Sequence, residues 1–278
     1  MLISSLKSAL NNYLWNIRNS SYKIASGDSI LDKDIKIFVI THKDKPLPDI
    51  FDNHNVYIPL RVGNMSNPTI HKDWLTDDSG ENISEYNALI NEITGIWWVA
   101  KHYQKLGNPS FVGFNHYRRF LQWHPTLLEK NTLISTSGTY FHTLYHYWKN
   151  STSYYYEKDI ADKFRNAFLN TFKNTEYCDY DKYMNSHTLF YSNLFITDRE
   201  TFFSYFSFLE KCLELVFEMM KNNAINLRGV SPYRKRIYSF FLEHMTSYWI
   251  FHGRQKKFKH ITTMETYFNI PNMETSLH

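Results

Sequence analysis

The stretch FVGFNHYRRF, residues 111–120, changes from apolar to polar within a single segment. Its first half, with Phe111, Val112 and Phe114, is typical of a buried β-strand. Its second half carries an amide, an imidazole, a phenol and two guanidinium groups, on Asn115, His116, Tyr117, Arg118 and Arg119. This pattern predicts a core strand whose carboxyl end carries a polar site.

The residues before this stretch predict two more strands of the same sheet. IKIFVITHK, residues 35–43, alternates and then becomes continuously apolar before it ends at the polar residues Thr41, His42 and Lys43. VYIPL, residues 56–60, is a second predicted strand.

A helix is predicted between these strands and the opening stretch. Apolar residues recur at helical spacing from Glu85 to about Leu106, and Gly-Asn-Pro at residues 107–109 ends the period. The order strand, helix, strand predicts a right-handed crossover and an α/β fold with a mostly parallel sheet. Ligands bind beyond the carboxyl ends of such strands, which places residues 41–42 and 115–119 at one edge.

The second half of the chain is less regular. Residues 126–185 are rich in tyrosine, polar and weakly periodic, which predicts a helical or loop-rich insertion that lines a cleft. HTLFYSNLFI, residues 187–196, predicts a third strand, and helices are predicted over residues 199–222 and 233–251.

The composition argues against several classes of protein. The 278 residues include 31 basic and 27 acidic ones, and the net charge of +4 is low for a nucleic-acid binder and better suited to a small anionic ligand or an acidic membrane surface. The two cysteines are too few for a disulfide framework and predict a reduced, cytoplasmic protein. No window approaches the roughly 18 to 20 apolar residues of a membrane-spanning helix, and no cleavable signal pattern is present.

Residues 1–26 contain three basic residues and no acidic one, with apolar side chains three and four positions apart. This spacing predicts an amphipathic helix. Two interpretations stay open: the helix binds a membrane surface or a partner, or it packs on its own domain.

The polar run TDDSGENIS, residues 76–84, predicts a loop that leads into the first helix with Ser84 as its N-cap. Helix N-termini bind anions, because their first N–H groups are unpaired and lie at the positive end of the helix dipole. In one interpretation Asp77, Asp78 and Glu81 hold the hydroxyls of a sugar or ribose while the amides face phosphate. In the other, the loop is a solvated turn that caps the helix.

Glu92 lies on the helix face that is predicted to be buried, beside Leu89 and Ile96. A buried carboxylate needs a partner, and Arg118 or Arg119 is the expected one. The alternative is a slight rotation of the helix that exposes Glu92 to solvent.

The neighbouring arginines point to opposite sides of an extended segment. One of Arg118 and Arg119 is therefore expected to bind a diphosphate bidentately, while the other braces Glu92 or a nearby aspartate. His116 is suited to phosphate binding, proton transfer, metal ligation or a structural role. Glu243, on an otherwise apolar helix, is a candidate acid or base.

Other chemical signatures are weak or absent. His142 and His146 are four positions apart, as zinc ligands on a helix can be, but no acidic or cysteine ligand stands near them in the sequence. The chain has no glycine-rich phosphate loop and no G-x-S-x-G nucleophile motif. The usual signatures of kinases, dehydrogenases and hydrolases are therefore missing.

Six segments resemble, in this order, a bacterial family of capsular-polysaccharide and O-antigen glycosyltransferases first catalogued as domain of unknown function 4422: IKIFVITHK, DDSGENIS, NEITGIWWVAKH, FVGFNHYRRF, SNLFITDRETF and RIYSFFLEHM. The resemblance covers about residues 35–250, and HYRR after an apolar strand is its most specific mark. It implies a GT-A-like, Rossmann-like sheet and an enzyme that uses a nucleotide sugar, with UDP-hexoses such as UDP-galactose favoured.

The resemblance also implies the residues of the site and the division of the chain. Glu243 is expected to activate the acceptor hydroxyl, and His116 to stabilise the departing diphosphate with the arginines. The implied donor-binding residues are Thr41, His42, Asp78, Asn82, Glu92, Asn115, Tyr117, Arg118, Arg119 and Asn193. A leader at residues 1–34 precedes a single glycosyltransferase domain at 35–270, with a nucleotide-binding half at 35–125, an insertion or acceptor region at 126–185 and a C-terminal helical half at 186–270.

Many GT-A enzymes hold a divalent metal with an Asp-x-Asp motif at a strand end, where this chain has Asn-His-Tyr-Arg-Arg. Fixed cations are therefore expected to neutralise the diphosphate, without a metal or another cofactor. The alternative is that Asp77 or Asp78 recruits Mg²⁺ or Mn²⁺.

The expected function is hexose transfer to a growing capsule or lipopolysaccharide glycan on a lipid carrier. The leader helix would keep the enzyme at the inner face of the cytoplasmic membrane. A non-catalytic glycan- or nucleotide-binding module is the alternative. A single-stranded nucleic-acid binder is a third interpretation, against which the modest charge argues.

Overall fold

The computed structural model describes residues 34–44, 46–63, 71–155, 159–190 and 192–267. The predicted amphipathic helix at residues 1–26 lies outside these ranges. Within them, no helix is long and apolar enough to cross a membrane.

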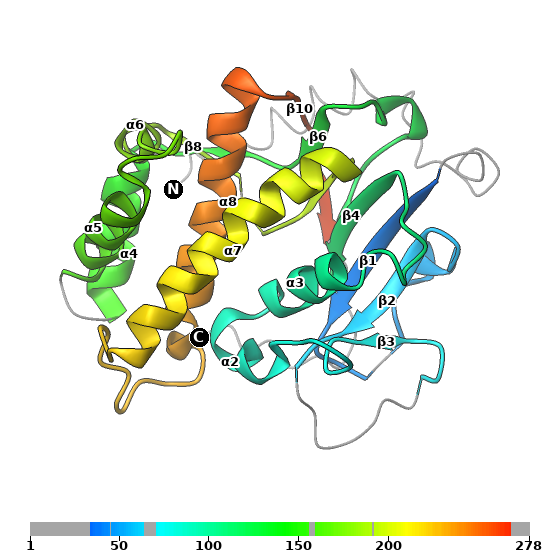
Figure 1. The fold of residues 1–278 in the computed structure, drawn as a ribbon, viewed down its shortest axis with the longest axis horizontal. Helices are drawn as coiled ribbons and strands as arrows, with labels where there is room; N and C mark the ends of the chain where they lie inside the picture. The colour runs from blue at the N-terminus through cyan, green and yellow to red at the C-terminus, as the bar shows by residue number, and fades with distance from the viewer. Residues whose placement is uncertain (1–33, 45, 64–70, 156–158, 191, 268–278) are drawn as a thin grey trace.

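A nine-stranded mixed sheet lies at the centre of the described residues (Figure 1). Its main path has the strand order β10-β6-β9-β4-β1-β2-β3, and β5 and β11 extend from β4. The strands are β1 (Ile35–Thr41), β2 (Tyr57–Arg61), β3 (Leu75–Thr76), β4 (Phe111–His116), β5 (Arg119–Leu121), β6 (Thr132–Ser135), β9 (Phe195–Asp198), β10 (Lys259–Thr262) and β11 (Glu265–Tyr267). A separate hairpin pairs β7 (Gly138–Thr139) with β8 (Thr188–Leu189).

The sheet is mostly parallel along its main path. β1 pairs in parallel with β4 and with β2, β2 pairs in parallel with β3, and β10 with β6. β9 is the exception, because it runs antiparallel to both of its neighbours, β4 and β6. Its amino end therefore lies beside the carboxyl end of β4, with Phe195 opposite Phe114. The predicted α/β class and mostly parallel sheet are confirmed.

Alternate residues of β1 face two hydrophobic layers, as the pleat of a strand requires. Ile37 and Val39 belong to the smaller layer, whereas Phe38 and Ile40 belong to the larger one. The neighbouring strand β4 carries Gly113 where space is short, since a Cβ there would lie only 2.7 Å from the Ile196 side chain. β1 and β4 are thus buried on both faces, and their polar residues gather at the strand ends.

Helices cover the larger hydrophobic layer in two tiers (Figure 1). The longer helices α7 and α8 cross in front of the sheet with α3, and α4, α5 and α6 lie beyond α7 and α8. The α-helices are α2 (Asn87–Ile90), α3 (Ile93–Lys101), α4 (Leu144–Tyr155), α5 (Ile160–Phe172), α6 (Tyr180–Met184), α7 (Arg199–Lys221) and α8 (Ile237–Lys256). Short 3-10 turns are η2 (Asp49–Phe51), η3 (Ser84–Tyr86), η4 (Pro125–Leu127) and η5 (Arg234–Arg236).

The single helix predicted from Glu85 to Leu106 is wrong, because the structure divides it into η3, α2 and α3. The interruption falls at Asn91, whose φ is +50°. The Asn87 amide donates to the Asn91 carbonyl at 2.7 Å and to Thr94 Oγ1 at 3.0 Å, so side-chain hydrogen bonds compete with the regular helical ones. Ser84 is not the N-cap either, since the Asn82 Oδ1 accepts its N–H at 3.2 Å.

Two further predictions about elements need correction. Residues 187–196 do not form one strand, because a turn at Ser192 and Asn193 separates β8 from β9. Residues 126–185 are not wholly an insertion, since β6 belongs to the central sheet. The polar pair Ser192-Asn193 was the signal for this turn within the otherwise apolar segment.

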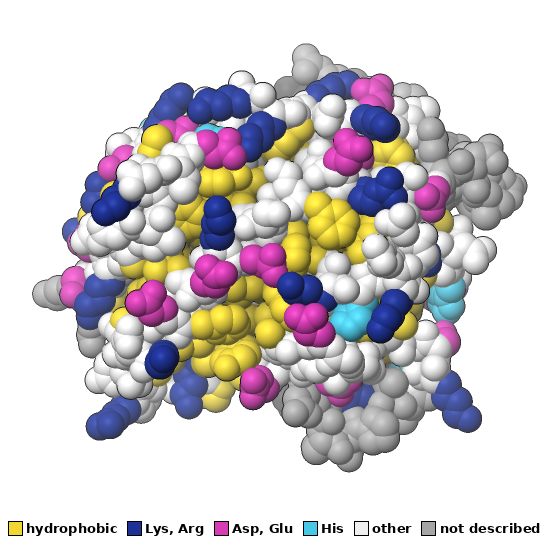
Figure 2. All heavy atoms as spheres, viewed as in Figure 1, with side chains coloured by type: hydrophobic (Ala, Val, Ile, Leu, Met, Phe, Trp, Pro, Cys, Tyr) yellow, Lys and Arg dark blue, Asp and Glu magenta, His cyan; other side chains and the backbone are white. Residues whose placement is uncertain are grey.

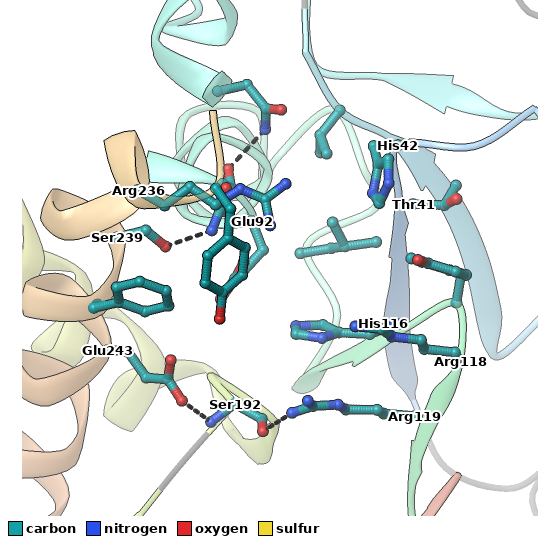
Figure 3. A pocket seen from close by; sticks show the side chains of 17 residues that line it. Thr41, His42, Glu92, His116, Arg118, Arg119, Ser192, Arg236, Ser239 and Glu243 are labelled. Atoms are coloured by element: carbon teal, nitrogen blue, oxygen red, sulfur yellow. Dashed lines mark hydrogen bonds between the residues drawn. The ribbon is translucent and has the colours of Figure 1, made fainter. Parts of the chain in front are cut away.

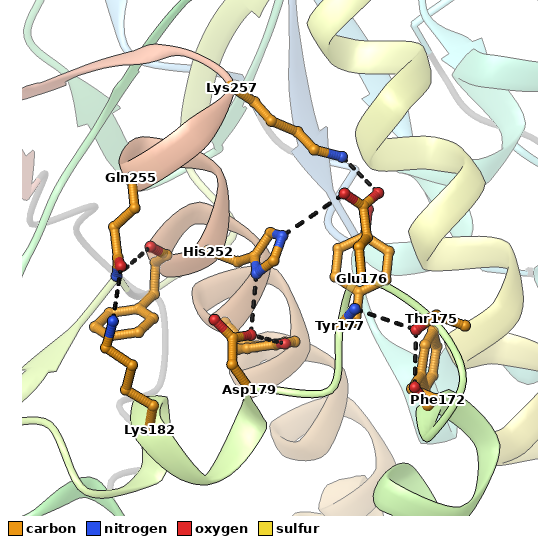
Figure 4. A network of polar contacts seen from close by, with 11 residues as sticks. Phe172, Thr175, Glu176, Tyr177, Asp179, Lys182, His252, Gln255 and Lys257 are labelled. Atoms are coloured by element: carbon orange, nitrogen blue, oxygen red, sulfur yellow. Dashed lines mark hydrogen bonds and ion pairs between the residues drawn. The ribbon is translucent and has the colours of Figure 1, made fainter.

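A polar network anchors the carboxyl half of α8 (Figure 4). His252 is 1% exposed, and its Nδ1 lies 3.0 Å from Asp179 Oδ1, which also accepts the Tyr248 hydroxyl at 2.6 Å. Glu176 lies 3.8 Å from the His252 Nε2 and accepts a hydrogen bond from Lys257 at 2.6 Å. These contacts fasten α8 to the segment between α5 and α6.

Basic and acidic side chains are interspersed over the face shown in Figure 2, with apolar side chains between them. No basic stripe crosses that face of the described residues. The charge distribution there gives no electrostatic track for a nucleic acid.

Candidate active site

A pocket opens at the carboxyl ends of β1 and β4, where the sheet faces the amino half of α8 (Figure 3). Of the residues that the sequence predicted, it brings together Thr41, His42, Glu92, His116, Tyr117, Arg118, Arg119 and Glu243. None of its lining residues comes from residues 126–185, which were expected to line a cleft.

One face of α8 forms the wall opposite the strands. Ser239, Phe240 and Glu243 of α8 line the pocket together with Arg236, the N-cap of α8 at the end of η5. Ser239, Phe240 and Glu243 follow Arg236 by three, four and seven residues, which places all four on one helical stripe. Along the helix axis, the first and last of these residues are about 10 Å apart, from a rise of about 1.5 Å per residue. The wall therefore has a cationic end and an acidic end.

Glu243 has the protonation behaviour of an acid or base that works near neutral pH. Burial, together with the charge of Glu92, raises the pKa of Glu243 to about 7, although the Ser192 N–H and Arg119 act in the opposite direction. The Ser192 N–H donates to Glu243 Oε1 at 2.5 Å. A carboxyl group with this pKa is suited to proton transfer.

His116 is neutral at physiological pH. Burial lowers its pKa to about 4, despite the opposing effect of Glu92. Its Nε2 is buried and has no hydrogen-bond partner among the described residues. His116 can therefore act on a ligand through a hydrogen bond rather than as a fixed positive charge.

Glu92 enters the pocket from the N-cap of α3. The Asn193 amide donates to Glu92 Oε1 at 2.7 Å, a contact that the sequence did not suggest. The same region is tied to α8, because the Asn91 amide donates to Ser239 Oγ at 2.8 Å. Glu92 thus lies at the junction between the interrupted helix and α8.

The two neighbouring arginines have different surroundings. Arg119 donates to Ser192 Oγ, and its charge offsets part of the rise that burial causes in the pKa of Glu243 and of Glu265. Arg118 is exposed, and its guanidinium lies 5.8 Å from the ring centre of Tyr117. Arg119 therefore belongs to the framework of the pocket, while Arg118 lies at its rim.

Arg236, which the sequence reasoning missed, lies across the pocket from Arg118 (Figure 3). Within the described ranges, neither of the two forms an ion pair with a carboxylate. The signal in the sequence was the position of Arg236 seven residues before Glu243, which places both on one face of a helix. The two guanidinium groups are suited to binding an anion between them.

Four predicted donor-binding residues do not line the pocket. Asn115 is buried, and its Oδ1 accepts the Leu121 N–H at 3.1 Å, which closes the connection between β4 and β5. Asn193 lies behind Glu92, as described above. Asp78 and Asn82 belong to an exposed turn, in which the Asn82 amide donates to the Gly80 carbonyl at 2.9 Å.

Asp77 and Asp78 of the acidic loop differ in their surroundings, since Asp78 is exposed. Asp77 is buried, its Oδ1 accepts the Gly63 N–H at 2.8 Å, and burial raises its pKa to about 6. Across the described residues, no group of three or more histidine, cysteine, aspartate or glutamate side chains is placed to hold a metal ion. His142 and His146 lie with ring centres 4.3 Å apart and belong to no such group.

The fold matches that of a solved glycosyltransferase. The apo structure of WbbM, a bifunctional glycosyltransferase, has a TM-score of 0.68 against this chain, covering 86% of it at 20% sequence identity. The chain covers 46% of that protein, so it spans about half of the matched structure. No curated protein matches the sequence.

Residues 36–256 match the model of the family described as a domain of unknown function, DUF4422. The chain belongs to this family. The matched range begins in β1 and ends with α8, so it includes both walls of the pocket.

Proposed function

We propose that the protein is a nucleotide-sugar-dependent glycosyltransferase with a GT-A-like fold. In this proposal it transfers a hexose, with UDP-hexoses favoured as donors, to a growing capsule or lipopolysaccharide glycan on a lipid carrier. The likeness of the fold to a bifunctional glycosyltransferase supports the reaction class. The observation that carries the proposal is the α8 wall, with Arg236 at one end and Glu243 at the other.

This wall suits a ligand with two different ends. Arg236 and Arg118 face the pocket from opposite sides and would bind the diphosphate of the donor. Glu243 lies at the other end of the α8 wall from Arg236, and Glu243, Glu92 and the neutral His116 offer hydrogen bonds for which hydroxyl groups of sugars are natural partners. A nucleoside diphosphate sugar has this order of charged and hydroxyl-rich parts.

The chemical step follows from these positions. The Glu243 carboxylate takes the proton of the acceptor hydroxyl, and the acceptor oxygen forms a bond to the anomeric carbon. The bond between that carbon and the phosphate oxygen breaks, and its electrons pass to the departing diphosphate. Arg118 and Arg236 stabilise the charge that develops there.

The test is the release of nucleoside diphosphate from a panel of sugar nucleotides, with and without acceptor glycan. We expect saturable release of UDP from a UDP-hexose that increases when the acceptor is present. Saturable binding of UDP without any turnover would instead indicate the non-catalytic binding module.

We expect the same reaction to proceed undiminished in excess EDTA. In this proposal the guanidinium groups of Arg118 and Arg236 neutralise the diphosphate in place of a metal. Activity that is lost in EDTA and restored by Mn²⁺ would contradict this prediction. An Asp78→Ala variant then tests whether the acidic loop supplies a ligand.

A further inference from the structure

The turn at Ser192 and Asn193, just before β9, has an unusual backbone. The φ angles are +74° and +50°, in the left-handed region that residues other than glycine rarely occupy. Both residues are buried, at 4% and 3% exposure. A buried turn without glycine in this region is kept only where the surrounding contacts enforce it.

This turn contacts three charged residues that line the pocket. The Ser192 N–H donates to Glu243 Oε1 at 2.5 Å, and the Ser192 Oγ accepts a hydrogen bond from Arg119. The Asn193 amide donates to Glu92 Oε1 at 2.7 Å. The three side chains come from α8, from β5 and from the N-cap of α3, so the turn joins three separate elements at one point.

We propose that Ser192 and Asn193 are positioning residues, whose turn holds Glu243, Arg119 and Glu92 in one arrangement and so determines how Glu243 exchanges its proton. The inference rests on the proposed function, in which Glu243 is the base. Asn193 does not line the pocket, and it acts through Glu92 rather than on the substrate.

The turn can affect the proton exchange of Glu243 because Glu243 and Glu92 are two carboxylates that repel each other. Without the turn, Glu92 and Glu243 would be free to change their separation, and their mutual repulsion depends on that separation. The charged and titratable groups that act on Glu243 come from several elements: Glu92 at α3, Arg119 on β5, Glu265 on β11 and Tyr183 on α6, while His116 on β4 lines the same pocket. Only the turn contacts Glu92, Arg119 and Glu243 together through hydrogen bonds among the described residues.

Two substitutions of Asn193 separate positioning from donor binding. Asn193→Asp keeps the size of the side chain but places a third carboxylate beside Glu92, which raises the pKa of Glu243 by about one pH unit. Asn193→Gly accepts the left-handed backbone without strain but removes the amide. We expect it to shift the Glu243 titration because Glu92 is released, to lower kcat about 10-fold and to leave the Kd for UDP within about 2-fold.

Asn131 provides a matched control, because it is an exposed asparagine with a φ of +54° outside the pocket. Asn131→Gly should leave the Glu243 titration and kcat unchanged. Carboxyl carbon NMR of protein labelled at glutamate measures the titration, with the Glu243 signal identified by its loss in Glu243→Gln. Thermal unfolding of each variant verifies that it is folded.

The titration needs no substrate, so it tests the turn independently of the reaction. If the unmodified protein transfers no sugar but Asn193→Gly, which adds no charge, still shifts the Glu243 titration, the proposed function fails and the positioning role stands. An unchanged titration in Asn193→Gly overturns the inference. It is equally overturned if Asn193→Gly weakens UDP binding about 10-fold with kcat intact, because that result marks a direct contact with the donor.

Discussion

Replacing Glu243 with glutamine is expected to lower kcat by about 10²- to 10⁴-fold, the usual contribution of a general base. Glutamine has nearly the same shape and still accepts the Ser192 N–H through its side-chain carbonyl, but it cannot take a proton from the acceptor. The Kd for UDP should stay within about 2-fold, because the proposed diphosphate site includes Arg236 at the other end of the α8 wall.

The pH dependence of kcat/KM tests whether Glu243 is the general base. The base must be a carboxylate, so kcat/KM should fall as the pH drops through the Glu243 pKa of about 7. His116, with a pKa lowered to about 4, titrates at too low a pH to cause this fall in kcat/KM. The fall in kcat/KM near pH 7 should disappear in Glu243→Gln and persist in Glu214→Gln, which changes an exposed glutamate on α7. An unaltered profile in Glu243→Gln would show that another group is the base.

The second large effect is expected at the opposite end of the pocket. Arg118→Ala and Arg236→Ala should each weaken UDP binding by about 10- to 100-fold, since a hydrogen bond to a charged group contributes about 1.5–3 kcal/mol. The double variant should be weaker than either single one, because the two guanidinium groups reach the diphosphate from opposite walls.

Calorimetric titration with UDP measures this effect. Lysine at either position should recover only part of the affinity, because it restores the charge but not the bidentate geometry. Arg228→Ala is the matched control, since it removes an exposed guanidinium outside the pocket. Full UDP affinity in both Arg118→Ala and Arg236→Ala would refute the diphosphate site.

The elements with strong local periodicity could be predicted from the sequence. β1 and β4 are continuous apolar runs, and α7 has a regular apolar face that begins after its N-cap Asp198, so local residues determine them. The interruption at Asn91 was hidden, because it depends on hydrogen bonds made by the Asn87 side chain. Periodicity reports which face is buried and carries no information about such competing bonds.

The part of the pocket that is formed by strand ends could be predicted from the sequence. Parallel strands bring their carboxyl ends to one edge, which placed Thr41 and His116 together. The pairing of Glu92 with Asn193 and the position of Arg236 were not predictable in this way, because they join residues far apart in the sequence. Such contacts depend on how helices pack on the sheet.

The antiparallel direction of β9 determines which connections can reshape the ligand edge. In a purely parallel sheet, only segments that follow strands arrive there, whereas here the segment that precedes β9 arrives as well. Insertions or deletions before Ser192 would therefore alter the pocket while the strand pairings stay intact. A change of length in that one connection can thus reshape the pocket without rebuilding the sheet.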